Sequence, residues 1–65
     1  MTNVRVLECP ETGDVIFLNK IIKIKQFDID AEGYYRYDIL TNDNYYTSFY
    51  TKTRTYLELF KTIKL

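Results

Sequence analysis

The chain has 65 residues, nine basic and nine acidic side chains, one cysteine and no histidine. A chain of this length has room for one domain, buries roughly 60% of its unfolded surface and is marginally stable. Because Cys9 is the only cysteine, an internal disulfide is excluded, and a structural zinc site lacks its Cys and His ligands. We therefore take residues 1–65 as one domain, expect no metal or cofactor, and expect self-association to supply additional stability.

The charge balance disfavours partners that are recognised by a strong electrostatic field. Residues 1–33 carry four basic and six acidic side chains, and residues 34–65 carry five and three, so neither half is a charged arm. The sequence has no apolar run of the roughly 18 residues that span a membrane, and none typical of a signal peptide. With a lone cysteine that suits a reducing compartment as a small buried residue, these features predict a cytoplasmic protein without membrane contact.

The first third of the chain predicts a hairpin. Residues 4–9 and 14–18 are rich in strand formers, and residues 10–13, Pro-Glu-Thr-Gly, are typical of a turn. In such a turn Gly13 supplies the positive φ that other residues avoid. We expect the two segments to pair with each other.

A third strand is predicted over residues 21–27. Here Ile22 and Ile24 alternate with Lys23 and Lys25, which places the isoleucines and the lysines on opposite faces. Lysines along one face are typical of an edge strand that is protected against edge-to-edge aggregation.

Residues 28–33, Asp-Ile-Asp-Ala-Glu-Gly, have the beginning of an EF-hand calcium loop. The complete loop needs a bidentate glutamate at its twelfth position, which is Ile39 here, and a helix on either side. Because both flanks predict strands, we interpret the segment as an acidic turn with Gly33 in a left-handed conformation. Weak cation binding by its three carboxylates stays open as the alternative.

Residues 34–50 contain six of the seven tyrosines around the polar residues 41–44 and predict a second hairpin. A three-residue loop at 42–44 pairs Ile39 with Thr47. The core side is then formed by Tyr35, Tyr37, Ile39, Tyr45 and Phe49. The exposed side is formed by Tyr34, Arg36, Asp38, Leu40, Tyr46, Ser48 and Tyr50. A two-residue loop would slip this register, and the sequence has no Asn-Gly pair to fix the turn.

The C-terminal residues 56–64 predict a short amphipathic helix. Tyr56, Leu57, Phe60 and Ile63 recur at helical spacing, with Leu59 beside them. Thr55 and Glu58 have the spacing of a capping box. The expected fold is therefore α+β and mostly β: a small antiparallel sheet or open barrel of about five strands, with one C-terminal helix packed on it.

Eight turn and strand residues occur in a particular order and spacing along the chain: Gly13, Ile16, Leu18, Asn19, Ile21, Ile24, Thr41 and Asn42. This order resembles the small flagellar FlbD family, in which a glycine tends to stand where this chain has Asp43. The resemblance implies a flagellar accessory protein and brings no active site with it. Residues 21–60 are also similar to the core of the LytTR DNA-binding domain, which is longer and more basic.

No histidine and no motif that places a nucleophile beside a base are present, so we predict that the chain is not an enzyme. The main hypothesis is a small protein-interaction module, a regulator or inhibitor that binds an unidentified partner protein and self-associates. A phage-encoded factor also fits the composition. The candidate partner-binding residues are Tyr34, Arg36, Tyr46 and Tyr50, because Tyr and Arg are enriched in the energetic centres of interfaces.

Two alternatives stay open for the exposed tyrosines. Their rings could serve only to strengthen the sheet through cross-strand pairs. They could also stack on nucleic-acid bases while Arg36, Lys52 and Arg54 hold phosphates. The zero net charge disfavours this second alternative, since phosphate neutralisation dominates such affinities.

Overall fold

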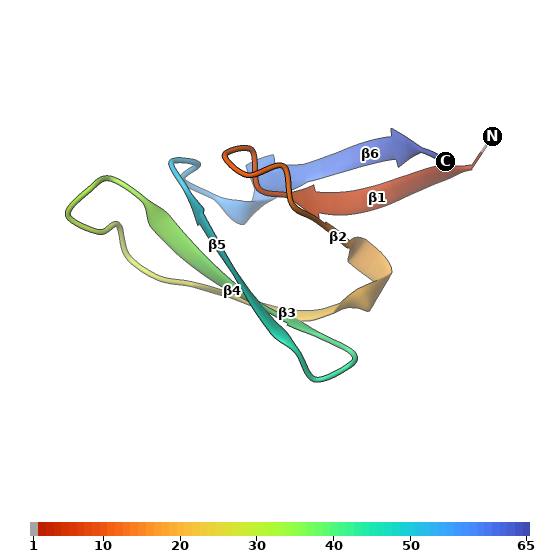
Figure 1. The fold of residues 1–65 in the computed structure, drawn as a ribbon, viewed down its shortest axis with the longest axis horizontal. Helices are drawn as coiled ribbons and strands as arrows, with labels where there is room; N and C mark the ends of the chain where they lie inside the picture. The colour runs from red at the N-terminus through yellow and green to blue at the C-terminus, as the bar shows by residue number, and fades with distance from the viewer. Residues whose placement is uncertain (1) are drawn as a thin grey trace.

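The computed structural model describes residues 2–65, which form two three-stranded antiparallel sheets that do not close into a barrel (Figure 1). The elements in chain order are β1 (Asn3–Glu8), β2 (Val15–Phe17), the 3-10 turn η1 (Leu18–Lys20), β3 (Ile21–Gln26), β4 (Tyr35–Thr41), β5 (Tyr46–Thr51), the 3-10 turn η2 (Tyr56–Leu59) and β6 (Phe60–Lys64). The strand order is β2-β1-β6 in one sheet and β3-β4-β5 in the other. The mostly β fold is confirmed, but the single sheet or open barrel of about five strands is wrong, because the described residues form six strands in two separate sheets.

The predicted first hairpin is also confirmed. Strands β1 and β2 pair antiparallel, with Leu7 opposite Ile16. The turn between them is closed by backbone hydrogen bonds from the Cys9 amide to the Asp14 carbonyl (2.9 Å) and from the Gly13 amide to the Cys9 carbonyl (2.8 Å). Gly13 has a φ of 77°, which explains why a residue without a Cβ stands there.

The predicted C-terminal helix is wrong. Residues 56–59 form one 3-10 turn, and residues 60–64 form β6, which pairs with β1 from Leu7 opposite Phe60 to Asn3 opposite Lys64. Thr55 does cap the turn, since its hydroxyl oxygen accepts from the Leu57 amide at 3.3 Å. An isolated helix of this length is marginal in water, whereas β6 satisfies the backbone groups on the second side of β1.

The predicted register of the second hairpin is confirmed. Ile39 lies opposite Thr47, and the Thr41 amide donates to the Tyr45 carbonyl at 3.0 Å across a three-residue loop. Asn44 takes the left-handed conformation in this loop, with a φ of 68°. Asparagine tolerates that conformation better than most residues, so the loop closes without an Asn-Gly pair.

The core lies between the two sheets. Its cluster of buried side chains comes from both sheets, from the β1–β2 loop and from η2: Leu7, Cys9, Tyr37, Ile39, Phe49 and Leu59. The prediction that Tyr37, Ile39 and Phe49 face the core is confirmed, and Tyr35 packs partly buried against the cluster. The prediction that Tyr45 faces the core is wrong, because this side chain is 70% exposed. It lies at the end of the hairpin, beyond the area that the first sheet covers. The Tyr37 hydroxyl donates to the Thr53 carbonyl at 2.8 Å, so the buried phenol is satisfied.

The third strand is an edge strand, as predicted, but its alternation is interrupted. The pairing of β3 with β4 shifts between Ile21 and Lys23, so Ile22 leaves the ladder and is 64% exposed. The prediction that Ile22 shares a buried face with Ile24 is therefore wrong, while Ile24 packs partly buried against the core. An extra residue of this kind is a β-bulge, which inverts the alternation on one side of the irregularity.

The loop from β3 to β4 is an acidic turn, as predicted. The Asp30 carboxylate accepts backbone hydrogen bonds from Glu32 and Tyr34, both at 2.9 Å, and Gly33 has a φ of 89°. Asp30 is thus explained as a turn residue that satisfies backbone amides. Within residues 2–65, no group of Asp, Glu or Cys side chains is arranged to hold a metal ion.

The β1–β2 loop reaches across to the far end of β5. Glu11 accepts from the Lys52 amide at 2.8 Å, and the Cys9 thiol lies 3.6 Å from the Tyr50 carbonyl oxygen. Burial raises the pKa of Glu11, but hydrogen bonds from Lys52 and Thr51 outweigh it and hold this pKa below its usual value. These contacts join the first sheet to the second.

Candidate functional site

The side of the β3-β4-β5 sheet that faces away from the core brings cations and aromatic rings together. Its side chains stand in cross-strand rows because residues opposite one another in antiparallel strands share a face. The rows are Lys23, Leu40 and Tyr46, then Lys25, Asp38 and Ser48, then Phe27, Arg36 and Tyr50. We call these nine residues the outer face.

Three of the four predicted site residues lie on the outer face, and the fourth lies directly beside it. Arg36 lies opposite Tyr50 on the neighbouring strand, and Tyr46 lies two rows away. Tyr46 and Tyr50 are 63% and 51% exposed. Tyr34, the fourth, is half-buried just before β4, where the Lys52 ammonium lies 5.4 Å from the centre of its ring. Tyr34 and Lys52 therefore extend the outer face at one end.

The centre of the outer face is a hydrogen-bonded ion pair. Arg36 donates to Asp38 through Nε (2.8 Å) and Nη2 (2.9 Å), and the Ser48 hydroxyl donates to the same carboxylate at 2.8 Å. The Arg36 guanidinium holds the pKa of Asp38 below its usual value, with help from Ser48 and Lys25. Asp38 in turn raises the pKa of Arg36. The arginine is consequently fixed in position while 45% of its side chain stays exposed.

Phe27 is the residue that the sequence interpretation missed. Its ring has the Arg36 guanidinium carbon 4.7 Å and the Lys25 ammonium 5.1 Å from its centre. Contacts of this kind contribute about 0.5–1 kcal/mol each at exposed sites. The signal available in the sequence was Lys23-Ile24-Lys25-Gln26-Phe27, in which two lysines and an aromatic residue alternate on one side of a strand that pairs with Arg36.

A shallow depression of about 260 Å³ lies within the outer face, lined by Lys23, Lys25, Phe27, Asp38 and Tyr46. Lys23 and Lys25 take part in no ion pair among residues 2–65, so their charges are available to a ligand. The depression therefore offers two ammonium groups beside two aromatic rings. This combination suits an anionic group attached to an apolar one.

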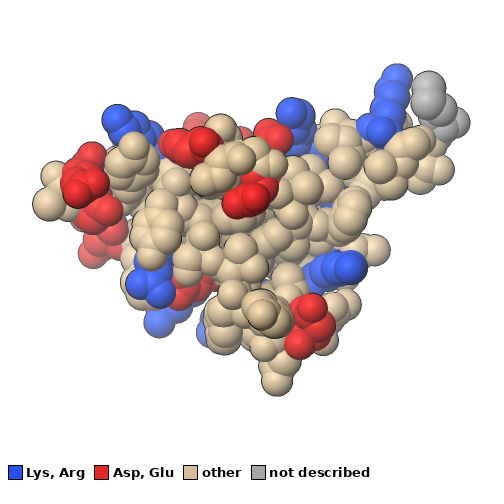
Figure 2. Space-filling view, in the orientation of Figure 1, with Lys and Arg blue, Asp and Glu red and all other residues tan. Residues whose placement is uncertain are grey.

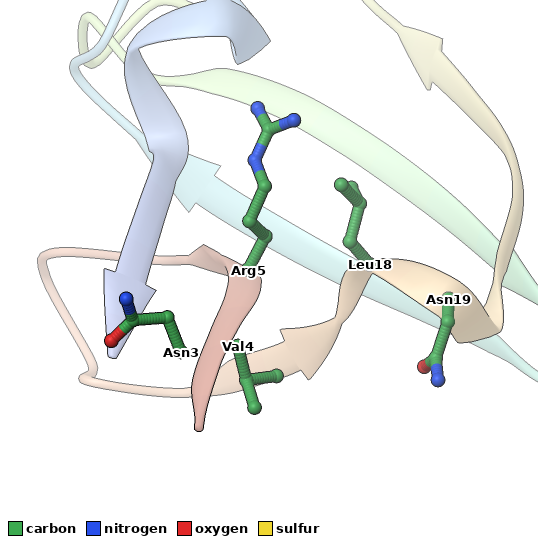
Figure 3. Close-up of a pocket in the computed structure, with 5 residues that line it drawn as sticks. All are labelled: Asn3, Val4, Arg5, Leu18 and Asn19. Atoms are coloured by element: carbon green, nitrogen blue, oxygen red, sulfur yellow. The ribbon is translucent and has the colours of Figure 1, made fainter. Parts of the chain in front are cut away.

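A second, more open groove of about 570 Å³ lies between β1 and η1 (Figure 3). Asn3, Val4 and Arg5 line one side and Leu18 and Asn19 the other, with the Arg5 and Leu18 side chains extending toward the same space. The Arg5 guanidinium already lies over the Phe60 ring at 5.6 Å. Arg5 therefore covers Phe60, the first residue of β6.

Acidic side chains gather elsewhere on the molecule. Figure 2 shows one group of them at the end where the β3–β4 loop projects, which contains Asp28, Asp30 and Glu32, and others spread over the rest of this view. The outer face itself carries three cations, Lys23, Lys25 and Arg36, against one carboxylate, Asp38. Although the net charge of the chain is zero, it thus presents a locally positive surface beside a locally negative loop.

The fold and this face describe a small β-sheet domain with an aromatic and cationic surface. No protein-family model, curated protein or solved structure matches the chain. The resemblance to the FlbD family and the similarity to the LytTR domain therefore stay predictions. Among residues 2–65, no helical segment has the length and apolar character needed to cross a membrane.

Proposed function

We propose that this chain is a non-catalytic protein-interaction module, a regulator or inhibitor in the cytoplasm that binds a partner protein through the outer face and self-associates. The observation that carries the proposal is the fixed, exposed Arg36 flanked by Phe27 and Tyr50 on adjacent strands. Arginine and aromatic side chains on a rigid sheet lose little freedom on binding, which is typical of the energetic centre of an interface. The cytoplasmic setting is supported by the single buried cysteine.

The chemistry of the outer face supports a partner segment that is both acidic and apolar. Lys23 and Lys25 supply charge for carboxylates, and the rings of Phe27 and Tyr46 supply apolar area. Charge complementarity of this kind chiefly increases the association rate and the specificity. Contact with the rings supplies most of the affinity.

Labelled peptides of alternating glutamate and leucine test this proposal, with lysine–leucine peptides as the charge-reversed control. We expect the acidic peptide to bind with NMR shifts centred on the outer face, and Phe27→Thr to weaken binding at least about tenfold, as for a hot-spot residue. Tyr46→Thr should also weaken it, whereas Tyr45→Thr is the matched control, because Tyr45 is similarly exposed but lies outside the face. Equal binding of both peptides, or unchanged affinity of folded variants, would refute the proposal.

Nucleic-acid binding is the second candidate. It is favoured by the stacking of Lys25 and Arg36 on Phe27 and of Lys52 on Tyr34, since ring and cation side by side suit bases and phosphates. Oligothymidine binding measured at two salt concentrations separates this candidate from the first. An affinity that falls steeply with salt would favour it, and no retention at low salt would remove it.

Two further readings stay predictions. The FlbD resemblance proposes a flagellar accessory role, which co-purification with flagellar components would test. A phage origin is proposed from composition alone, and the neighbouring genes would decide it.

A further inference from the structure

The free edge of β5 differs from the other three sheet edges of this fold. Edge strands are normally protected by charges, proline, irregularity or shortness. Strand β3 carries two lysines and a bulge, β2 has three residues, and β6 carries Lys61 and Lys64. Strand β5, Tyr-Thr-Ser-Phe-Tyr-Thr, has six residues and no charge, proline, glycine or bulge. It is the edge best suited to pair with another strand.

The register defines which backbone groups this edge presents. The Thr41 amide donates to the Tyr45 carbonyl directly opposite, so in an antiparallel pair Thr47, Phe49 and Thr51 also point their amides and carbonyls toward β4. The amides and carbonyls of Tyr46, Ser48 and Tyr50 consequently point away from the sheet. Among residues 2–65, the β1–β2 loop makes two contacts on this side: the Cys9 thiol lies near the Tyr50 carbonyl, and Glu11 accepts from the Lys52 amide just past β5. Both lie at the Tyr50 end, which leaves the amides and carbonyls of Tyr46 and Ser48 available.

We infer that β5 pairs antiparallel with β5 of a second copy of this chain, about a two-fold axis at Ser48. The Ser48 amide of each subunit donates to the Ser48 carbonyl of the other, and Tyr46 of each lies opposite Tyr50 of the other. The strand is thereby complementary to itself. Its lack of charge means that no like charges meet, and the paired tyrosine rings stack on one face of a continuous six-stranded sheet.

The size of the core supports a second copy as the occupant of this edge. The cluster of buried residues has six members in the described chain, and the radius of gyration is 12.0 Å. A compact domain of this length has a radius of gyration of about 10.7 Å. A small core in an extended molecule is the condition in which short chains gain stability by oligomerising.

This inference deepens the self-association part of the proposed function and rests on it. Sedimentation and light scattering over a concentration series test it. We expect the mass to rise toward twice the 7.8 kDa of one chain as concentration increases. Ser48→Pro removes both central amide donors and should raise the dissociation constant at least about tenfold. The Ser48 amide makes no bond to β4, so proline leaves the intramolecular ladder intact.

Two matched variants serve as controls. Ser48→Ala loses the hydroxyl that donates to Asp38 but keeps the amide, so it should dimerise as the natural chain does. Thr62→Pro removes an amide that points away from β1 on the free edge of β6. It should leave the mass of the assembly the same as that of the natural chain. If Ser48→Pro does not fold, Ser48→Lys places two like charges opposite each other across the axis and should also give a monomer.

A second measurement follows the edge directly. Amides of Tyr46, Ser48 and Tyr50 should exchange slowly with solvent at high concentration and rapidly on dilution or in Ser48→Lys. A natural chain that is monomeric throughout the series, or a dimer that Ser48→Pro and Ser48→Lys both leave intact, would overturn the inference. Phe27→Thr, just past the opposite edge strand β3, should weaken peptide binding without changing the mass of the assembly, so each proposal can be refuted independently of the other.

Discussion

Two leucines in η2 test whether the C-terminal residues form a turn and a strand. Leu59 is 3% exposed and belongs to the core cluster, whereas Leu57 is 63% exposed. Leu59→Ala should destabilise the domain by about 2–5 kcal/mol, because it removes buried methyl groups and leaves a cavity. Leu57→Ala should change stability by no more than about 0.5 kcal/mol. A 65-residue domain has a total stability of about 3–10 kcal/mol, so the first change removes much of it.

Urea denaturation, followed by tyrosine fluorescence and far-ultraviolet circular dichroism, measures both variants. If Leu59→Ala is too unstable for a folded baseline, Leu59→Val deletes one methylene at a cost of about 0.8 kcal/mol. In a helix over residues 56–64, Leu57 would share the buried stripe with Phe60 and Ile63. Equal costs for the two positions, or a larger cost for Leu57→Ala, would therefore refute the turn and strand.

Three further predictions concern polar groups of the second sheet. Tyr37→Phe removes the donor to the Thr53 carbonyl and should cost about 1 kcal/mol in urea, whereas Tyr45→Phe, at an exposed ring, should cost nothing measurable. Arg36 lowers the pKa of Asp38, so stability from the ionised carboxylate is present above the unfolded pKa of about 3.9 and is lost as pH falls through the lower folded value. Asp38→Asn should reduce this loss of stability at low pH. If the free energy of unfolding of the variant and of the natural chain fell equally with pH, Asp38 would not be its source. Burial raises the pKa of Tyr37, so stability present below about pH 10 should decline as pH rises toward the folded value, and Tyr37→Phe should reduce this alkaline decline.

The second hairpin could be predicted from the sequence because its signals are local. Alternation puts Arg36, Asp38 and Ser48 on one side of the strands, and their mutual hydrogen bonds now explain why that register is preferred. Tyr46 and Tyr50 follow from the same alternation. The exception is Tyr45, for which alternation gives the side of the strand but not whether the other sheet extends far enough to cover it.

The features that could not be predicted depend on distant pairing. The spacing of Leu57, Phe60 and Ile63 fits a helix, but Phe60 and Ile63 actually face β1, which lies more than 50 positions earlier in the chain. Local propensity is weak enough for such pairing to override it. Phe27 was missed for a related reason, since it joins the outer face only because β3 folds back on β4 across the acidic loop.

The two proposals, if both hold, combine into a mode of action that neither gives alone. A two-fold axis perpendicular to the sheet keeps the outer faces of both subunits on the same side, because residues opposite each other in antiparallel strands project to one face. The dimer would then present two copies of the outer face to a partner. Binding of the second copy becomes intramolecular and can raise avidity by about 10²- to 10⁴-fold without any new contact. Ser48→Pro and Ser48→Ala both lose the hydroxyl that donates to Asp38, but only Ser48→Pro loses the edge amide. Ser48→Pro should therefore capture less densely immobilised acidic peptide than Ser48→Ala, while the two variants bind the same peptide free in solution with equal affinity.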